Sequence, residues 1–81
     1  MKIINRHNKT VPQWIKDAET SDAIIEIDRD GLVIWHGGVW LDGTWNGAIW
    51  HCGFWKGGVW KGGTWLDGTW KGGLWWGGNY R

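Results

Sequence analysis

Tryptophan occupies every fifth position along the second half of the chain, separated by residues that are mostly small or polar. The positions are Trp35, Trp40, Trp45, Trp50, Trp55, Trp60, Trp65, Trp70 and Trp75, and Tyr80 continues the spacing. The repeated unit is Trp-x-(Gly/Asp)-Gly-x. Because so short a unit buries its apolar side chain only against neighbouring copies, the pattern predicts a repeat architecture.

A short helix is predicted before the repeats, at residues 11–19. Thr10 and Gln13 match a capping box, and Pro12 falls in the first turn, where its missing N–H costs nothing. The apolar residues at helical spacing are Val11, Ile15 and Ala18, with Trp14 beside them. We interpret Trp14 as a packing residue, because it borders the apolar stripe that the helix has to bury.

The rest of the N-terminal third predicts short strands. Residues 2–5 are a weak strand candidate. Residues 23–29 and 32–35 are typical of two strands joined at Asp30-Gly31, a pair that suits a two-residue type I′ hairpin turn. The first tryptophan of the repeat therefore already lies on a strand.

This hairpin register pairs Ile27 with Ile34 and gives the hairpin an apolar face for the helix to cover. The residues on that face are Ile25, Ile27, Leu32 and Ile34. We expect residues 1–34 to form a small N-terminal helix plus β-hairpin cap that closes one edge of the repeats. Residues 35–81 form the Trp-Gly repeat region, and the two parts together make one compact unit.

The pentads themselves predict a mainly β fold. A three-residue strand centred on each tryptophan, followed by a two-residue turn, places Trp40 opposite Trp45 and all the indoles on one face. Every turn contains a glycine, as turns with positive φ require. The first architecture that fits is an antiparallel meander of very short strands.

A β-spiral or solenoid is the alternative architecture. Coils built from pentapeptides place a large residue inside and a small residue two positions earlier, and from Trp40 onwards that small residue is always Gly or Ala48. Two observations weigh against it: an indole is bulky for every inward position of a narrow four-sided coil, and the best internal match is offset by 25 residues. The sequence leaves both architectures open.

A row of indoles requires a cover. Monomers rarely expose more than roughly 300–600 Å² of apolar surface in one patch, and nine open indoles would exceed this severalfold. The sheet curls on itself, a second copy packs on it, or another partner binds. An accessible row would also stack on sugars or nucleobases. The candidate binding residues are Trp40, Trp45, Trp50, Trp55, Trp60, Trp65 and Trp70.

The residue spacing disfavours catalysis. On a meander, His36 and His51 are about 14 Å apart, too far to share a metal ion. Asp42 and Asp67 are about 24 Å apart, beyond the reach of an acid/base pair, and suit turns instead. The sequence therefore predicts a protein that is not an enzyme, with no catalytic residues, no metal site and no cofactor.

Charge and composition point to no particular partner. The formal net charge is +1, and the lysines of the repeats follow tryptophan and so face away from the indoles, which disfavours nucleic acid as a partner. No stretch is long and apolar enough to enter a membrane. The single Cys52 excludes an internal disulfide and fits a reducing compartment. We expect a soluble cytoplasmic protein.

The run Trp-Leu-Asp-Gly-Thr-Trp-Lys-Gly-Gly and the further Trp-x-Gly-Gly-x copies resemble the Trp/Gly pentad tracts of small proteins of tailed bacteriophages. The repeats also have a distant likeness to MORN repeats, whose core forms hairpins, although the period differs. The phage resemblance implies an accessory protein that acts in the host cytoplasm.

These observations lead to one principal hypothesis and two alternatives. The principal hypothesis is a non-enzymatic binding or assembly protein that forms a homo-oligomer through its tryptophan ladder and binds or inhibits a host or phage protein. The first alternative is a protein that sequesters a nucleotide or sugar ligand on the indole platform. The second is a structural component of the virion.

Overall fold

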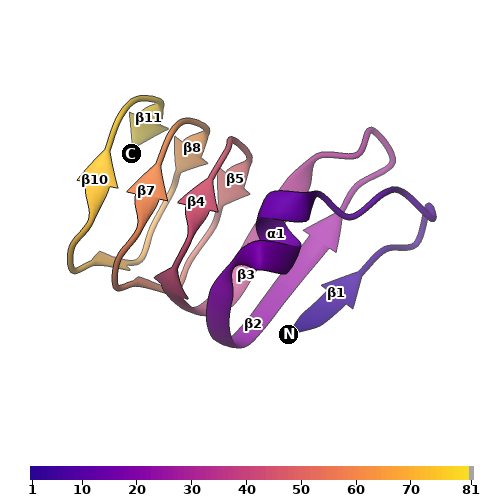
Figure 1. The fold of residues 1–81 in the computed structure, drawn as a ribbon. Helices are drawn as coiled ribbons and strands as arrows, with labels where there is room; N and C mark the ends of the chain where they lie inside the picture. Colours follow the sequence, from indigo (N-terminus) through magenta and orange to yellow (C-terminus); the bar gives the residue numbers. More distant parts are fainter. Residues whose placement is uncertain (81) are drawn as a thin grey trace.

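Residues 1–80 are described by a computed structural model, in which a small N-terminal cap is followed by a β-solenoid of about three coils. The coils follow one another in sequence order away from the cap, so the two termini lie towards opposite ends (Figure 1). The cap contains β1 (Lys2–Ile4), α1 (Gln13–Asp17) and β2 (Glu19–Ile27). The long strand β3 (Val33–Asp42) joins the cap to the solenoid.

Eight two-residue strands form the rest of the solenoid, each ending on an aromatic residue of the pentad pattern. They are β4 (Thr44–Trp45), β5 (Ile49–Trp50), β6 (Phe54–Trp55), β7 (Val59–Trp60), β8 (Thr64–Trp65), β9 (Thr69–Trp70), β10 (Leu74–Trp75) and β11 (Asn79–Tyr80). The predicted mainly β fold with a small N-terminal helix is confirmed.

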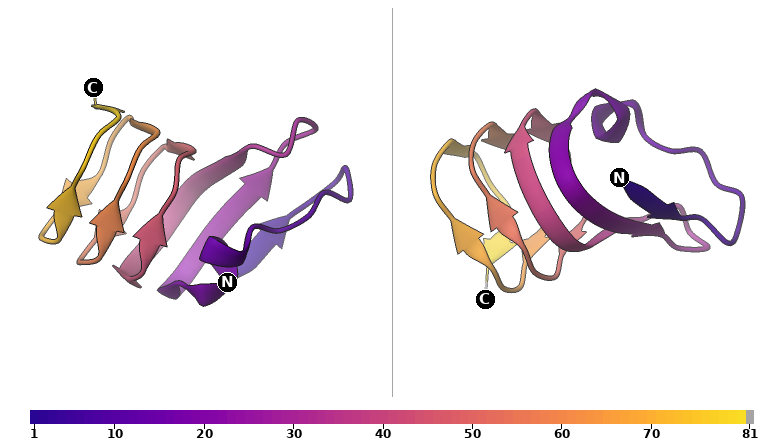
Figure 2. Two further views of the ribbon diagram at one scale, coloured as in Figure 1. Left: turned by 45° about the horizontal axis from the view of Figure 1, so that its top comes forward. Right: turned by 90° about the horizontal axis from the view of Figure 1, so that it is seen from below.

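From β5 onwards, each strand pairs in parallel with the strand three pentads earlier, so one coil contains three pentads and has three faces (Figure 2). The first face contains the start of β3, then β5, β8 and β11. The second contains the end of β3, then β6 and β9. The third contains β4, β7 and β10. Trp45 therefore pairs with Trp60 rather than with Trp40.

The solenoid is thus the architecture that forms, and the antiparallel meander is wrong. Its turns bend the chain around a corner instead of reversing it, and the closed coil hides from water the indoles that a flat sheet would expose. The bulk of the indole weighed against a four-sided coil. The coil has three faces instead, so only three rings meet in each layer. The structural period is three pentads and not the 25 residues of the best internal match. Every offset that is a multiple of five aligns tryptophan with tryptophan, so a good internal match does not identify the period.

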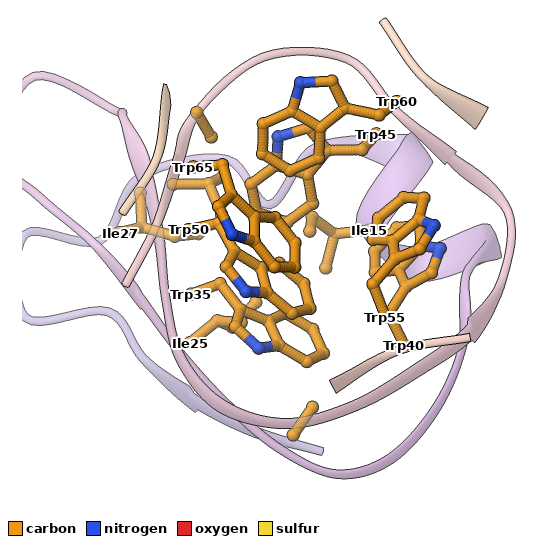
Figure 3. Packing of buried hydrophobic residues seen from close by; sticks show 13 residues of the cluster. Ile15, Ile25, Ile27, Trp35, Trp40, Trp45, Trp50, Trp55, Trp60 and Trp65 are labelled. Carbon is orange, nitrogen blue, oxygen red and sulfur yellow. The ribbon is translucent and has the colours of Figure 1, made fainter. Parts of the chain in front are cut away.

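The core consists of three columns of stacked indoles (Figure 3). Within a column the rings are nearly parallel, with centroids 4.6 Å apart for Trp35 and Trp50 and 5.0 Å apart for Trp40 and Trp55. Between columns the rings meet edge to face, as Trp55 and Trp60 do at an interplanar angle of 76°. Both geometries are favourable for aromatic pairs, so the coil uses every ring in two kinds of contact.

The second residue of the turn lies where two successive coils approach most closely. Gly58 has a φ of 98°, and a Cβ there would overlap the carbonyl oxygen of Gly43 in the coil below. That same oxygen accepts a hydrogen bond of 2.9 Å from the amide of Val59. At the one turn with alanine in the second place, Ala48, the positive φ belongs to the leading Gly47, at 121°.

The predicted hairpin forms, but with a register shifted by one residue. Ile27 pairs with Val33 and Ile25 with Trp35, whereas the sequence predicted that Ile27 pairs with Ile34. The reason is a wider loop, in which the Asp28 carboxylate accepts hydrogen bonds from two backbone amides at 2.9 Å each. The buried residues of the hairpin are Ala23, Ile25, Ile27, Val33 and Trp35, while Leu32 is exposed and Ile34 half-buried.

The helix is shorter than predicted, since α1 begins after Pro12 and ends at Asp17. The predicted capping box of Thr10 and Gln13 is wrong, because no side chain caps the helix and the Gln13 side-chain amide donates to Asp17 instead, at 2.9 Å. Its Ile15 is buried in the core. Trp14 lies edge-on to Trp45 at a centroid distance of 5.0 Å, and this contact confirms its packing role. Since β3 runs through the predicted boundary between residues 34 and 35, the cap and the first coil share one strand.

Candidate functional site at the open end of the solenoid

The two ends of the solenoid differ in how far other parts of the chain cover them. At the N-terminal end, α1 covers the indole columns and β2 pairs along β3. At the other end, the last coil, residues 66–80, has no further coil on it within the described part of the chain. We call this surface the open end. The exposed fraction of the aromatic residues rises towards it, from 0% for Trp60 through 37% for Trp75 to 78% for Tyr80.

The open end contains an aromatic recess of about 300 Å³. Its lining residues are Trp65, Trp70, Trp75 and Tyr80. Tyr80 stands perpendicular to Trp75, with ring centroids 6.0 Å apart, so the two rings form a corner rather than a flat floor. Such a recess provides stacking and edge contacts for a flat apolar group.

The backbone of the last coil also has free hydrogen-bonding groups. From Trp35 to Trp60, the carbonyl of each repeat tryptophan accepts a hydrogen bond from the next coil, as Trp60 does from the amide of Trp76 at 2.8 Å. Among residues 1–80, no amide bonds the equivalent carbonyls of Trp70 and Trp75. The open end is therefore an unpaired sheet edge, which is a template for another strand.

Two large apolar side chains lie on the outer side of β10, next to the open end. Leu74 is 58% exposed and Trp76 is 66% exposed. Trp76 lies outside the five-residue spacing, in the place that Asn46 and Lys61 occupy in the two coils before it. The third face thus becomes more apolar towards the open end.

The residues predicted to bind a ligand lie mainly inside the coil. The rings of Trp40, Trp45, Trp50, Trp55 and Trp60 are fully buried and touch other rings, so the structure gives them a packing role. Of the predicted set, only Trp65 and Trp70 line the recess. Sequence reasoning omitted Trp75, Trp76, Tyr80 and Leu74. The signals for them were their place in the last pentads and the break in spacing at Trp76.

The predicted separation of the two histidines is wrong. Because His36 and His51 are one coil apart, their rings are neighbours, with centroids at 5.5 Å. His36 Nε2 also lies 3.0 Å from the carboxylate of Glu26 in β2. Within residues 1–80, no group of three or more histidine, cysteine, aspartate or glutamate side chains is placed to hold a metal ion.

The remaining polar side chains have local roles. Asp42 and Asp67 each accept a hydrogen bond of 2.8 Å from the amide of the following glycine, as the turn interpretation predicts. The separation predicted for them assumed a meander and does not apply. Lys56 and Lys71 lie on the outside of the coil, each with its ammonium 5.9 Å from the ring of Phe54. Cys52 is exposed and free.

Comparison with known proteins leaves the geometry as the only guide to function: no protein-family model, no curated protein and no solved structure matches the chain. In the described residues, no helix is long and apolar enough to cross a membrane.

Proposed function

We propose that this chain is a non-enzymatic binding or assembly protein whose working surface is the open end of the solenoid. A single observation supports this most directly: exposed aromatic rings and an unpaired sheet edge coincide on one surface. Strand addition to a free edge provides backbone hydrogen bonds, and side-chain pockets provide specificity. The partner that suits this surface is a polypeptide, either another copy of this chain or a host or phage protein.

The proposal keeps the principal hypothesis from the sequence but assigns binding to a different surface, the open end of the solenoid. The central indoles of the ladder are covered by the coil itself, so the ladder binds only where the coil ends. Inhibition of a host macromolecule would follow from occupying that macromolecule's own strand edge.

The first test is quantitative capture by the immobilised chain, with each retained polypeptide identified by mass spectrometry. We expect Trp76→Asn, which copies the residue of the first coil, to lower retention of a specific polypeptide at least tenfold, the change that about 1.4 kcal/mol produces. Lys56→Asn on the second face is the matched control and should retain it. If Trp76→Asn binds everything that the wild type binds, the open end is not the working surface.

A small planar ligand is the second candidate function, favoured by the aromatic recess. A nucleobase or the apolar face of a sugar would stack there, at about 1–3 kcal/mol per stacked ring. We expect such a ligand to quench tryptophan fluorescence in the wild type and to do so weakly in Tyr80→Ala. Absence of quenching or of a thermal shift with nucleosides, nucleotides and oligosaccharides would eliminate this candidate.

A further inference from the structure

We infer that the open end pairs with the open end of a second copy of this chain, in a closed two-fold dimer whose axis passes by Trp75. This inference rests on the proposed function, because it names the occupant of the same surface. It follows from four features of the structure: the symmetry of the last coil about Trp75, its outer apolar pair, the uncharged segment around Trp75, and the closed opposite end.

The first feature is the symmetry of the last coil about Trp75. A two-fold axis reverses chain direction, so the two edges meet as antiparallel strands. With Trp75 opposite Trp75 of the second copy, Trp70 lies opposite Tyr80 of that copy. The three aromatic positions of one end thus match the three of the other. Both copies of β10 then pair with each other, and β9 of each copy pairs with β11 of the other.

The backbone of Trp75 suits this pairing. The carbonyl of Trp60 points to the next coil, where it accepts from the amide of Trp76, and the carbonyl of Trp75 points off the open end in the same way. In a strand, the N–H and C=O of one residue point to the same side, so two Trp75 residues on the axis exchange both hydrogen bonds. The glycines at the corners allow a close approach of the two backbones.

The second feature is the outer apolar pair. In this register, Leu74 lies directly opposite Trp76 of the second copy, in a pair without hydrogen bonds, where side chains are closest. The contact occurs twice, by symmetry. These are two of the exposed large apolar side chains of the structure, and Trp76 is the residue that leaves the five-residue spacing.

The third feature is the placement of charge. Residues 72–80 (GGLWWGGNY) contain no charged residue, although Lys71 and Arg81 flank them in the sequence. In this register Lys71 lies opposite Asn79 of the second copy, so no two like charges among the described residues lie directly opposite each other.

The side chains of the open end supply an interface near the lower size limit for a specific dimer. From the exposed fractions of Leu74, Trp75, Trp76 and Tyr80, the accessible side-chain area is about 450 Å² per chain, since an aromatic side chain presents roughly 150–250 Å² in full. Complete burial in two chains would therefore supply roughly 900 Å², just below the ~1,000 Å² at which specific interfaces begin, so the paired backbone edge has to contribute the remainder.

The fourth feature is the closed N-terminal end, which limits the assembly to two copies. The helix and Trp14 cover the columns at that end, so a second open end finds no matching surface there. An interface that joins one patch to itself closes on two subunits, whereas one that joins different patches can continue into a filament. The structure therefore points to a dimer and not to a fibre.

Cross-linking between two single-cysteine variants tests the register. In a Cys52→Ser background, we expect a mixture of Leu74→Cys and Trp76→Cys chains to form at least five times more disulfide dimer than either alone, since their Cα atoms lie within bonding range. A mixture of Thr44→Cys and Asn46→Cys chains, on the same face two coils away, is the matched control. Analytical ultracentrifugation of Cys52→Ser should show a dimer, and Trp76→Asn should raise its Kd at least tenfold.

Any result that differs from these expectations contradicts either the register, the second copy as partner, or the proposed function. If the mixture of Leu74→Cys and Trp76→Cys chains is dimeric in ultracentrifugation and still gives no excess cross-link, the register and the axis are wrong. If ultracentrifugation shows a monomer at every concentration, a second copy is not the occupant of the open end. The proposed function then stands if Trp76→Asn still lowers the capture of another polypeptide at least tenfold. If Trp76→Asn changes neither dimerisation nor capture, both the inference and the proposed function are wrong.

Discussion

Gly58→Val should destabilise the fold by about 3 kcal/mol or more, enough to lower the Tm by roughly 15 °C in a domain of this size. Two costs combine at this position. The φ of 98° is strained for any side chain with a Cβ, and most of all for a β-branched one. The added Cβ would also overlap the carbonyl oxygen of Gly43, which is held in place by its hydrogen bond to Val59.

Glycine at the other turn position provides the control for this prediction. Gly62 does not have positive φ, and a Cβ there would meet no atom within 4 Å. We therefore expect Gly62→Ala to change stability by less than about 1 kcal/mol, and Gly58→Ala to cost at least twice as much. Lys56→Glu, which changes charge on an exposed residue, should also have little effect. Equal losses in urea unfolding for Gly58→Ala and Gly62→Ala would contradict the role of the close approach between coils.

These contrasts show what the sequence could establish about the fold. The five-residue spacing was sufficient to predict short strands, glycine turns and a single face for all the indoles, because each follows from local geometry. The number of pentads per coil was not accessible. A two-residue glycine turn with positive φ serves a hairpin or a corner equally, and only the packing of three indoles per layer decides between them.

Every long-range distance predicted from the sequence depended on the number of pentads per coil. Taking one strand separation per pentad placed His36 and His51 about 14 Å apart, whereas the coil brings them together as successive layers of one face. The hairpin register failed for a more local reason, since the Asp28 side chain holds a loop that a two-residue turn excludes. The candidate site was missed in part because the pentads of a periodic sequence are alike, so the sequence does not show which rings the described coils leave exposed.

Trp55→Ala should destabilise the fold by about 4 kcal/mol or more, which is a large fraction of the stability of a small domain. Trp55 is fully buried, and its ring stacks on Trp40 and on Trp70 at 5.0 Å each. It also meets Trp50 and Trp60 edge to face. Removing the ring leaves a cavity in the middle of one column, and the coils above and below cannot close it because their spacing is fixed by backbone hydrogen bonds.

The matched change at the open end is Trp75→Ala, whose ring stacks on Trp60 alone and is 37% exposed. We expect urea unfolding of the monomer to show a loss of about 2 kcal/mol or less for Trp75→Ala. Trp55→Phe should also be milder than Trp55→Ala, since it keeps a ring in the column and removes an indole N–H that is buried without a partner in the described chain. If Trp55→Ala and Trp75→Ala cost the same, the columns do not carry the stability of the solenoid, and the three-indole layer is not what holds the coil closed.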